Sequence, residues 1–100
     1  MNIELTKKNE SLLISLKGRL DANTSNLFEE KIINLEEGIK DLIIDMNGLE
    51  YISSAGLRVL LAAQKKMNKL GGSMVLKGAQ ACIKEIFEVT GFGGILTFED

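Results

Sequence analysis

The organisation of this chain follows from residues 45–57, which read Asp45-Met46-Asn47-Gly48-Leu49-Glu50-Tyr51-Ile52-Ser53-Ser54-Ala55-Gly56-Leu57. We predict a strand end, a loop and the first turn of a helix, because an apolar run over 42–44 leads in and an amphipathic segment leads out from Leu57. Ser53 and Ser54 therefore lie at a helix N-terminus, where the first N–H groups lack partners within the helix and the helix dipole is positive. A hydroxyl at this position is either a helix cap or an acceptor for phosphate.

Hydrophobic patterning on both sides of this stretch predicts alternating strands and helices. The run 42–44 lacks polar alternation, which predicts a strand buried on both faces. A loop over 19–25, rich in capping residues, leads into a helix that closes near Gly38. The other expected elements are strands over 2–8, 12–16, 73–77 and 95–98, and helices over 55–70 and 79–90. The predicted fold is α/β: one small domain over residues 1–100, with a mixed sheet of four to five strands packed with about three helices.

The composition is that of an ordinary globular domain and excludes several classes of protein. Of the 100 residues, 45% are hydrophobic and 26% are charged, and the net charge is −2; we therefore expect neither disorder nor direct nucleic-acid binding. No apolar run has the ~18 residues of a membrane span, and the first residues lack the pattern of a signal peptide, so we expect a cytoplasmic protein that does not insert into a membrane. Histidine is absent and Cys82 is the single cysteine, which removes disulfides, the common zinc sites and Ser-His or Cys-His nucleophile pairs.

Three segments carry a resemblance to a known family. Gly18-Arg19-Leu20-Asp21, Leu42-Ile43-Ile44-Asp45 and Tyr51-Ile52-Ser53-Ser54-Ala55-Gly56-Leu57, in this order and at these separations, resemble the STAS domain of bacterial anti-sigma factor antagonists. The resemblance implies a phosphorylation switch that is not an enzyme and has no cofactor of its own. Unphosphorylated, such a protein binds an anti-sigma factor that is also a serine kinase, and so frees a sigma factor. Phosphorylated on one serine by that kinase, it releases its partner.

The resemblance also assigns roles to particular residues. The phosphate acceptor falls on Ser54, two residues before Gly56. Many relatives have aspartate directly before the acceptor, whereas this chain has Ser53 there, so Ser53 is the alternative acceptor. Asp21 matches a family aspartate that is expected near the acceptor. The surface that docks onto the partner is expected to include the surroundings of Ser54, the 18–25 loop and the exposed face of the 55–70 helix, with the site residues Asp21, Asp45, Ser53, Gly56, Leu57 and Arg58.

Each of these residues also has a simpler structural interpretation. Both serines could serve only as helix caps, and Asp21 could be a turn or cap residue. Asp45, expected at a strand end, could be an acceptor that fixes the loop. Gly56 within a helix costs up to ~1 kcal/mol relative to alanine, which suggests close approach of another backbone, from a partner or from the neighbouring loop.

Two functions follow from the resemblance. The first is the switch described above, in a protein that is a monomer when free. The second is a constitutive accessory subunit of a membrane transporter or of a larger signalling assembly, which would bind without being phosphorylated.

Overall fold

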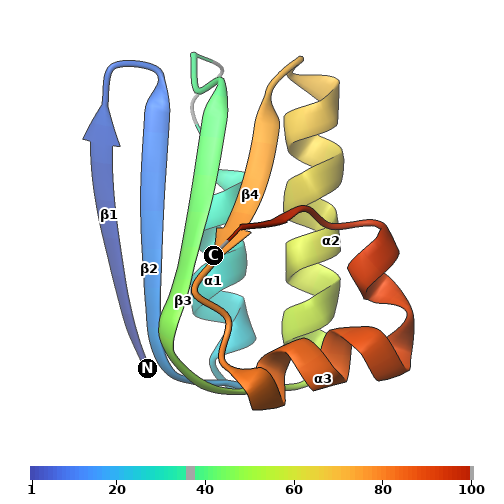
Figure 1. The fold of residues 1–100 in the computed structure, drawn as a ribbon. Coiled ribbons are helices and arrows are strands. Elements are labelled where there is room, and N and C mark those ends of the chain that lie inside the picture. Colours follow the sequence, from blue (N-terminus) through green and yellow to red (C-terminus); the bar gives the residue numbers. More distant parts are fainter. Residues whose placement is uncertain (36–37, 100) are drawn as a thin grey trace.

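The computed structural model describes residues 1–35 and 38–99, and this part of the chain forms one five-stranded sheet and three α-helices (Figure 1). A single turn of 3-10 helix, η1, precedes the last strand. In chain order the elements are β1 (Asn2–Lys8), β2 (Ser11–Leu20), α1 (Ser25–Ile33), β3 (Asp41–Ile52), α2 (Ser54–Lys69), β4 (Ser73–Lys77), α3 (Ala81–Thr90), η1 (Phe92–Gly94) and β5 (Phe98–Glu99).

The strands lie in the sheet in the same order as in the chain, β1-β2-β3-β4-β5. The hairpin of β1 and β2 is antiparallel, and every later pair is parallel. Parallel neighbours need a crossover connection, which α1, α2 and α3 supply. The predicted α/β fold with a mixed sheet is confirmed. Among the described helices, none is long and apolar enough to cross a membrane.

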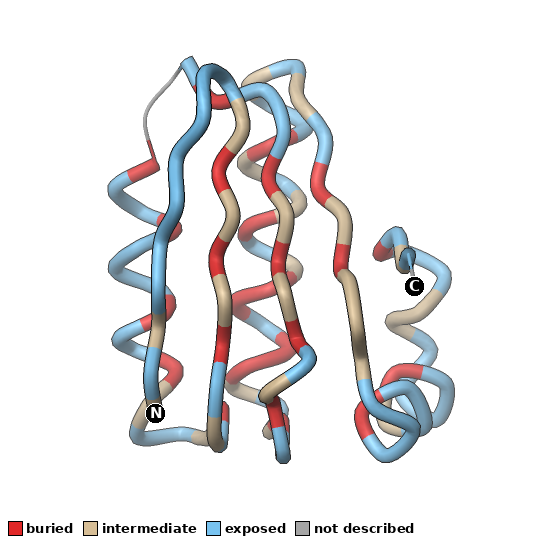
Figure 2. The backbone as a smooth tube through the Cα atoms, turned by 60° about the vertical axis from the view of Figure 1, so that its left-hand side comes forward, coloured by how far each residue is buried: buried red, intermediate tan, exposed pale blue. Residues whose placement is uncertain are grey.

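The helices cover one face of the sheet, and the other face is open. Figure 1 shows α1 and α2 running along the sheet and α3 lying at the lower right, below α2, and in Figure 2 buried positions alternate with less buried ones along β2 and β3. Leu42 and Ile44 are fully buried under the helices, whereas Ile43 points to the open face and is half-buried. The prediction that 42–44 is buried on both faces is therefore wrong, because no described helix packs on the second face.

Strand β3 is longer than predicted and passes through most of the presumed loop. It continues to Ile52, and its pairing with β2 shifts register twice, between Ser15 and Lys17 and between Gly18 and Arg19. At each shift β3 carries one residue more than β2, which is the geometry of a β-bulge. Bulges let the loop-like sequence Asn47-Gly48 remain within a strand. The predicted loop thus shrinks to Ser53 alone, between β3 and α2.

Helix α1 and the last strand also differ from expectation. Leu35 and Ile39 are buried, but α1 ends at Ile33 and not near Gly38, so both reach the core from non-helical backbone. Residues 36 and 37 of the predicted helix lie outside the described residues. The last strand, expected at 95–98, is confined to 98–99, and η1 precedes it at 92–94.

Candidate functional site

Ser53 caps helix α2. Its backbone is extended (φ −96°, ψ 174°), and its Oγ accepts a hydrogen bond from the Gly56 N–H at 3.4 Å. Its own N–H donates to the Leu20 carbonyl at 2.9 Å, which ties the start of α2 to the end of β2. Ser53 is half-buried, and both its side chain and its N–H have partners within the chain. The cap interpretation, which was given for both serines, therefore holds for Ser53.

Ser54 is the first residue of α2 and is exposed. It follows the capping residue directly, so its hydroxyl is not needed for the cap that Ser53 supplies. The first turn of α2 contains no acidic residue, and the positive end of the helix dipole lies there. Of the two serines, Ser54 is the one that an enzyme could reach and at which a negative charge would be favoured.

The loop that follows β2 is organised by Asp21. Its Oδ1 accepts hydrogen bonds from the N–H groups of Asn23 and Thr24, both at 3.0 Å, and lies 3.1 Å from the Thr24 hydroxyl. Thr24 Oγ1 accepts from the Asp21 N–H at 2.9 Å and donates to the Arg19 carbonyl at 2.7 Å. The hydrogen bond from the Thr24 N–H is the main reason why the pKa of Asp21 lies below its ordinary value. Asp21 therefore holds the turn that starts α1, which agrees with its simpler interpretation.

Thr24 was not among the predicted site residues, although the spacing Asp-x-x-Thr before a helix is a signal that could have identified it. A second feature of this end of the sheet, the stacking of Arg19 on Tyr51, has no signal in the local sequence pattern. The Arg19 guanidinium carbon lies 4.3 Å from the centre of the Tyr51 ring. The two residues are paired neighbours on β2 and β3, so their side chains meet on the same face.

Gly56 lets the start of α2 pack closely against the ends of β2 and β3. A Cβ atom at this position would lie 2.7 Å from Leu20 Cγ and 2.9 Å from Ile52 Cγ1, both in the core. The expected close approach is thus real, but side chains make it and not another backbone. Gly56 and Leu57 are buried, so they position α2 from inside and offer no surface to a partner; Arg58, the next residue, is exposed.

Asp45 lies apart from these residues. It is inside β3 and on the open face, where its carboxylate accepts from Ser15 Oγ at 3.2 Å and from the N–H and side-chain amide of Asn47 at 3.0 and 2.8 Å. The Asn47 N–H is the main cause that lowers its pKa. Six residues of β3, a span of about 20 Å, lie between it and Ile52. The expectation that Asp45 ends a strand beside the serines is wrong, because β3 continues past it.

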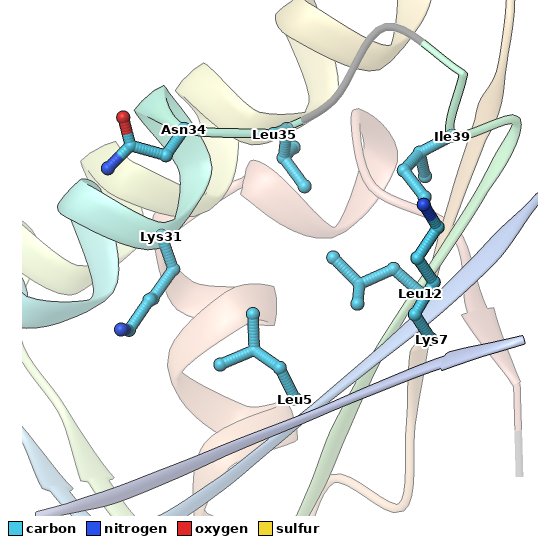
Figure 3. A pocket seen from close by; sticks show the side chains of 7 residues that line it. All are labelled: Leu5, Lys7, Leu12, Lys31, Asn34, Leu35 and Ile39. Carbon is cyan, nitrogen blue, oxygen red and sulfur yellow. The ribbon is translucent and has the colours of Figure 1, made fainter.

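A groove of about 310 Å³ at the opposite end of the sheet is not part of this site. Figure 3 shows its lining, Leu5, Lys7, Leu12, Lys31, Asn34, Leu35 and Ile39. These residues come from β1, the start of β2, the end of α1 and the segment between α1 and β3, whereas the serines follow the end of β3. The described residues contain no group of three or more His, Cys, Asp or Glu side chains that could hold a metal ion.

Comparison with known proteins places this geometry in a family. The family model described as the STAS domain matches residues 2–100. BtrV of Bordetella bronchiseptica, described as a candidate anti-sigma factor antagonist, is 33% identical over 93 residues, which are 92% of this chain and 80% of BtrV. The anti-sigma-B factor antagonist of Bacillus subtilis is 26% identical over 96 residues, covering 96% of this chain and 88% of that protein.

The fold is also that of a solved antagonist from Bacillus. SpoIIAA in its unphosphorylated form superposes with a TM-score of 0.79 at 20% identity, over 99% of this chain and 88% of SpoIIAA. Its phosphorylated form gives a TM-score of 0.77 at 19% identity, over 99% and 92% of the two chains. From the matched family model, the similar proteins and the shared fold, we conclude that the chain belongs to the STAS domain family of anti-sigma factor antagonists.

Proposed function

We propose that this protein is a phosphorylation switch that acts on an anti-sigma factor. Its unphosphorylated form binds an anti-sigma factor that is also a serine kinase, and the sigma factor is thereby released. The kinase transfers the γ-phosphoryl group of ATP to Ser54 Oγ; the hydroxyl proton is lost, ADP leaves, and the phosphorylated protein no longer binds. ATP and Mg²⁺ are held by the kinase.

The observation that carries this proposal is that the two adjacent serines have different surroundings. Ser53 is occupied as the cap of α2, and Ser54 is exposed beside it. The acceptor predicted from the family pattern is therefore the serine whose hydroxyl is free for chemistry. Membership of the STAS family and the naming of similar proteins as antagonists support the same function.

The docking surface that we propose surrounds Ser54. Asp21 and its turn border the start of α2 through the hydrogen bond between Leu20 and Ser53. Arg58 extends this surface along the exposed side of α2. A partner seated here covers a neutral hydroxyl in the unphosphorylated state. A phosphate adds about −1.5 to −2 charges, and removing such a charge from water costs more than a single ion pair returns, so the partner would dissociate.

The experiment that tests the proposal is phosphorylation by the cognate anti-sigma kinase with ATP, followed by mass spectrometry. We expect one phosphate, on Ser54, and none on a Ser54→Ala variant. A phosphate on Ser53, or on Thr24 in the Ser54→Ala variant, would disprove the assignment.

Binding distinguishes the switch from a constitutive accessory subunit. Ser54→Ala removes the acceptor but keeps a small neutral side chain, so we expect it to bind the anti-sigma factor as the unmodified protein does. The phosphorylated protein should bind at least tenfold more weakly. Equal binding by both forms would favour the accessory subunit.

A further inference from the structure

We propose that Arg58 is the intramolecular partner of the phosphate on Ser54 and holds it as an ion pair along the exposed side of α2. This inference rests on the proposed function, because it concerns the modified serine. It goes further by naming the residue of this chain that receives the new charge.

Helical geometry places the two side chains together. Ser54 and Arg58 belong to one regular helix and are four residues apart, a spacing at which the Cβ atoms are about 5–6 Å apart. Side chains on a helix lean towards its N-terminus. The long side chain of Arg58 therefore covers the turn that contains Ser54, and both residues are exposed.

Arg58 has no other charge to pair with on its own helix. The positions three before, three after and four after it are Ala55, Leu61 and Ala62, and no acidic residue lies in the first turn. Within the described parts of the chain, no hydrogen bond or ion pair engages its guanidinium group. An arginine in this setting gains its first close counter-ion when Ser54 is phosphorylated.

The second arginine of the chain is less suited to this role. The Arg19 guanidinium lies over the Tyr51 ring, 4.3 Å from its centre. Pairing with the phosphate would cost Arg19 this stacking, whereas Arg58 loses nothing. An anion that precedes a cation by four residues is also the favourable order on a helix, and arginine pairs with phosphate through two parallel hydrogen bonds.

This pairing changes what the switch does to its surface. In the unphosphorylated protein, Arg58 is a free cation on the proposed docking surface. After phosphorylation, Arg58 is paired with the phosphate. A partner then faces a phosphate in place of the Ser54 hydroxyl, and Arg58 is no longer available to it. Two contacts are therefore affected by one modification.

The test installs phosphoserine at position 54 during protein synthesis, so that no kinase is needed. The second ionisation of the phosphate is then followed by phosphorus NMR in the full chain. Arg58→Gln should raise the pKa of the phosphate by at least about 0.3, because the dianion loses its partner. The matched control is Lys65→Gln, an exposed cation two turns further along α2, which should leave that pKa within about 0.1.

Three results would overturn the inference. Equal shifts in Arg58→Gln and Lys65→Gln would mean that only the general field of α2 acts on the phosphate. If Arg19→Gln raised the pKa of the phosphate and Arg58→Gln did not, Arg19 would be its partner. If no variant changed this pKa, the phosphate would have no arginine partner and would lie in solvent. Asp21 is present in every variant, so its charge cancels in these comparisons. Because the phosphate is installed directly, these outcomes do not depend on whether a kinase modifies Ser54.

Discussion

Two adjacent serines at the start of α2 differ in what they do for the fold. Ser53 Oγ accepts from the Gly56 N–H, and Ser54 has no such role. Ser53→Ala should lower the free energy of unfolding by about 0.5–1 kcal/mol, the lower part of the range for a lost cap, because the hydrogen bond is long. Ser54→Ala should leave it unchanged or slightly higher. Urea unfolding of both variants checks this, and equal losses would contradict the assignment of the cap.

Gly56 is required because its neighbours leave no room for a side chain. In Gly56→Ala the new methyl group would lie 2.7 and 2.8 Å from Leu20 Cγ and Cδ2. Such overpacking costs about 1–3 kcal/mol, against about 1 kcal/mol gained from helix propensity, so we expect a net loss of up to about 2 kcal/mol in urea unfolding.

Gly94→Ala is the control for this substitution, since nothing lies within 4 Å of its Cβ position. It should change the stability by less than about 0.5 kcal/mol. If both variants were equally stable, the packing around Gly56 would have to be looser than described.

Asp21 and Asp45 make the stability of the protein depend on acid pH. The pKa of each lies below the ordinary value of 3.8 in the folded state, mainly through backbone N–H groups of Thr24 and Asn47. The stability that the charged forms contribute is therefore complete above pH 3.8 and is lost as the pH falls through the lower folded-state pKa. Asp21→Asn and Asp45→Asn should each flatten the fall in stability below about pH 4.

The two effects should add, because Asp21 holds the turn before α1 whereas Asp45 holds a distant part of β3. Chemical unfolding at a series of pH values measures them. A single substitution that removes the whole pH dependence below pH 4 would contradict this account.

At the scale of elements, α1 and α2 are joined by Lys66. Its Nζ donates to the carbonyls of Ile32 and Ile33, at 2.9 and 2.7 Å, and so satisfies the last turn of α1 from the neighbouring helix. Lys66→Met should cost about 1 kcal/mol and accelerate hydrogen exchange in the last turn of α1. Lys65→Met, at the exposed neighbouring position, should do neither.

The hydrogen bonds of Lys66 also show how far the helices and strands could be predicted from the sequence. The strands at 2–8 and 73–77 followed from local pattern alone and agree with the structure. The end of α1 did not, because a lysine 33 residues away from Ile33 in the chain supplies the partner for its carbonyl. The length of β3 was missed for a similar reason: its bulges depend on pairing with β2, which local propensity does not reveal.

The candidate site could also be predicted only in part from the sequence. The place of Ser54 at a helix start followed from the strand-to-helix pattern, and its identity as the acceptor followed only from the family resemblance. The burial of Gly56 and Leu57 and the distance of Asp45 from the serines depend on how β2 and β3 align. These relations are set by the whole sheet and not by neighbouring residues.

For the whole molecule, we predict that phosphorylation leaves the fold intact. The phosphate would be added at an exposed position at the positive end of α2, where an anion is favoured by about 0.3–1 kcal/mol. The phosphorylated and unphosphorylated proteins should therefore have the same circular dichroism spectrum and melt within a few degrees of each other. Amide chemical shifts should change near Ser54 only; changes across the sheet would mean that the switch is a conformational rearrangement.

The order of the strands has a consequence for the way in which the chain is made. Each strand pairs only with strands that are its neighbours in sequence, so no strand has to insert between two that have already paired, as it must in sheets with a shuffled order. A ribosome adds about 5–20 residues per second, whereas a hairpin forms in about 1–10 μs. The β1–β2 hairpin can thus form many times before β3 has emerged, and the nascent sheet can grow at one edge in the direction of translation.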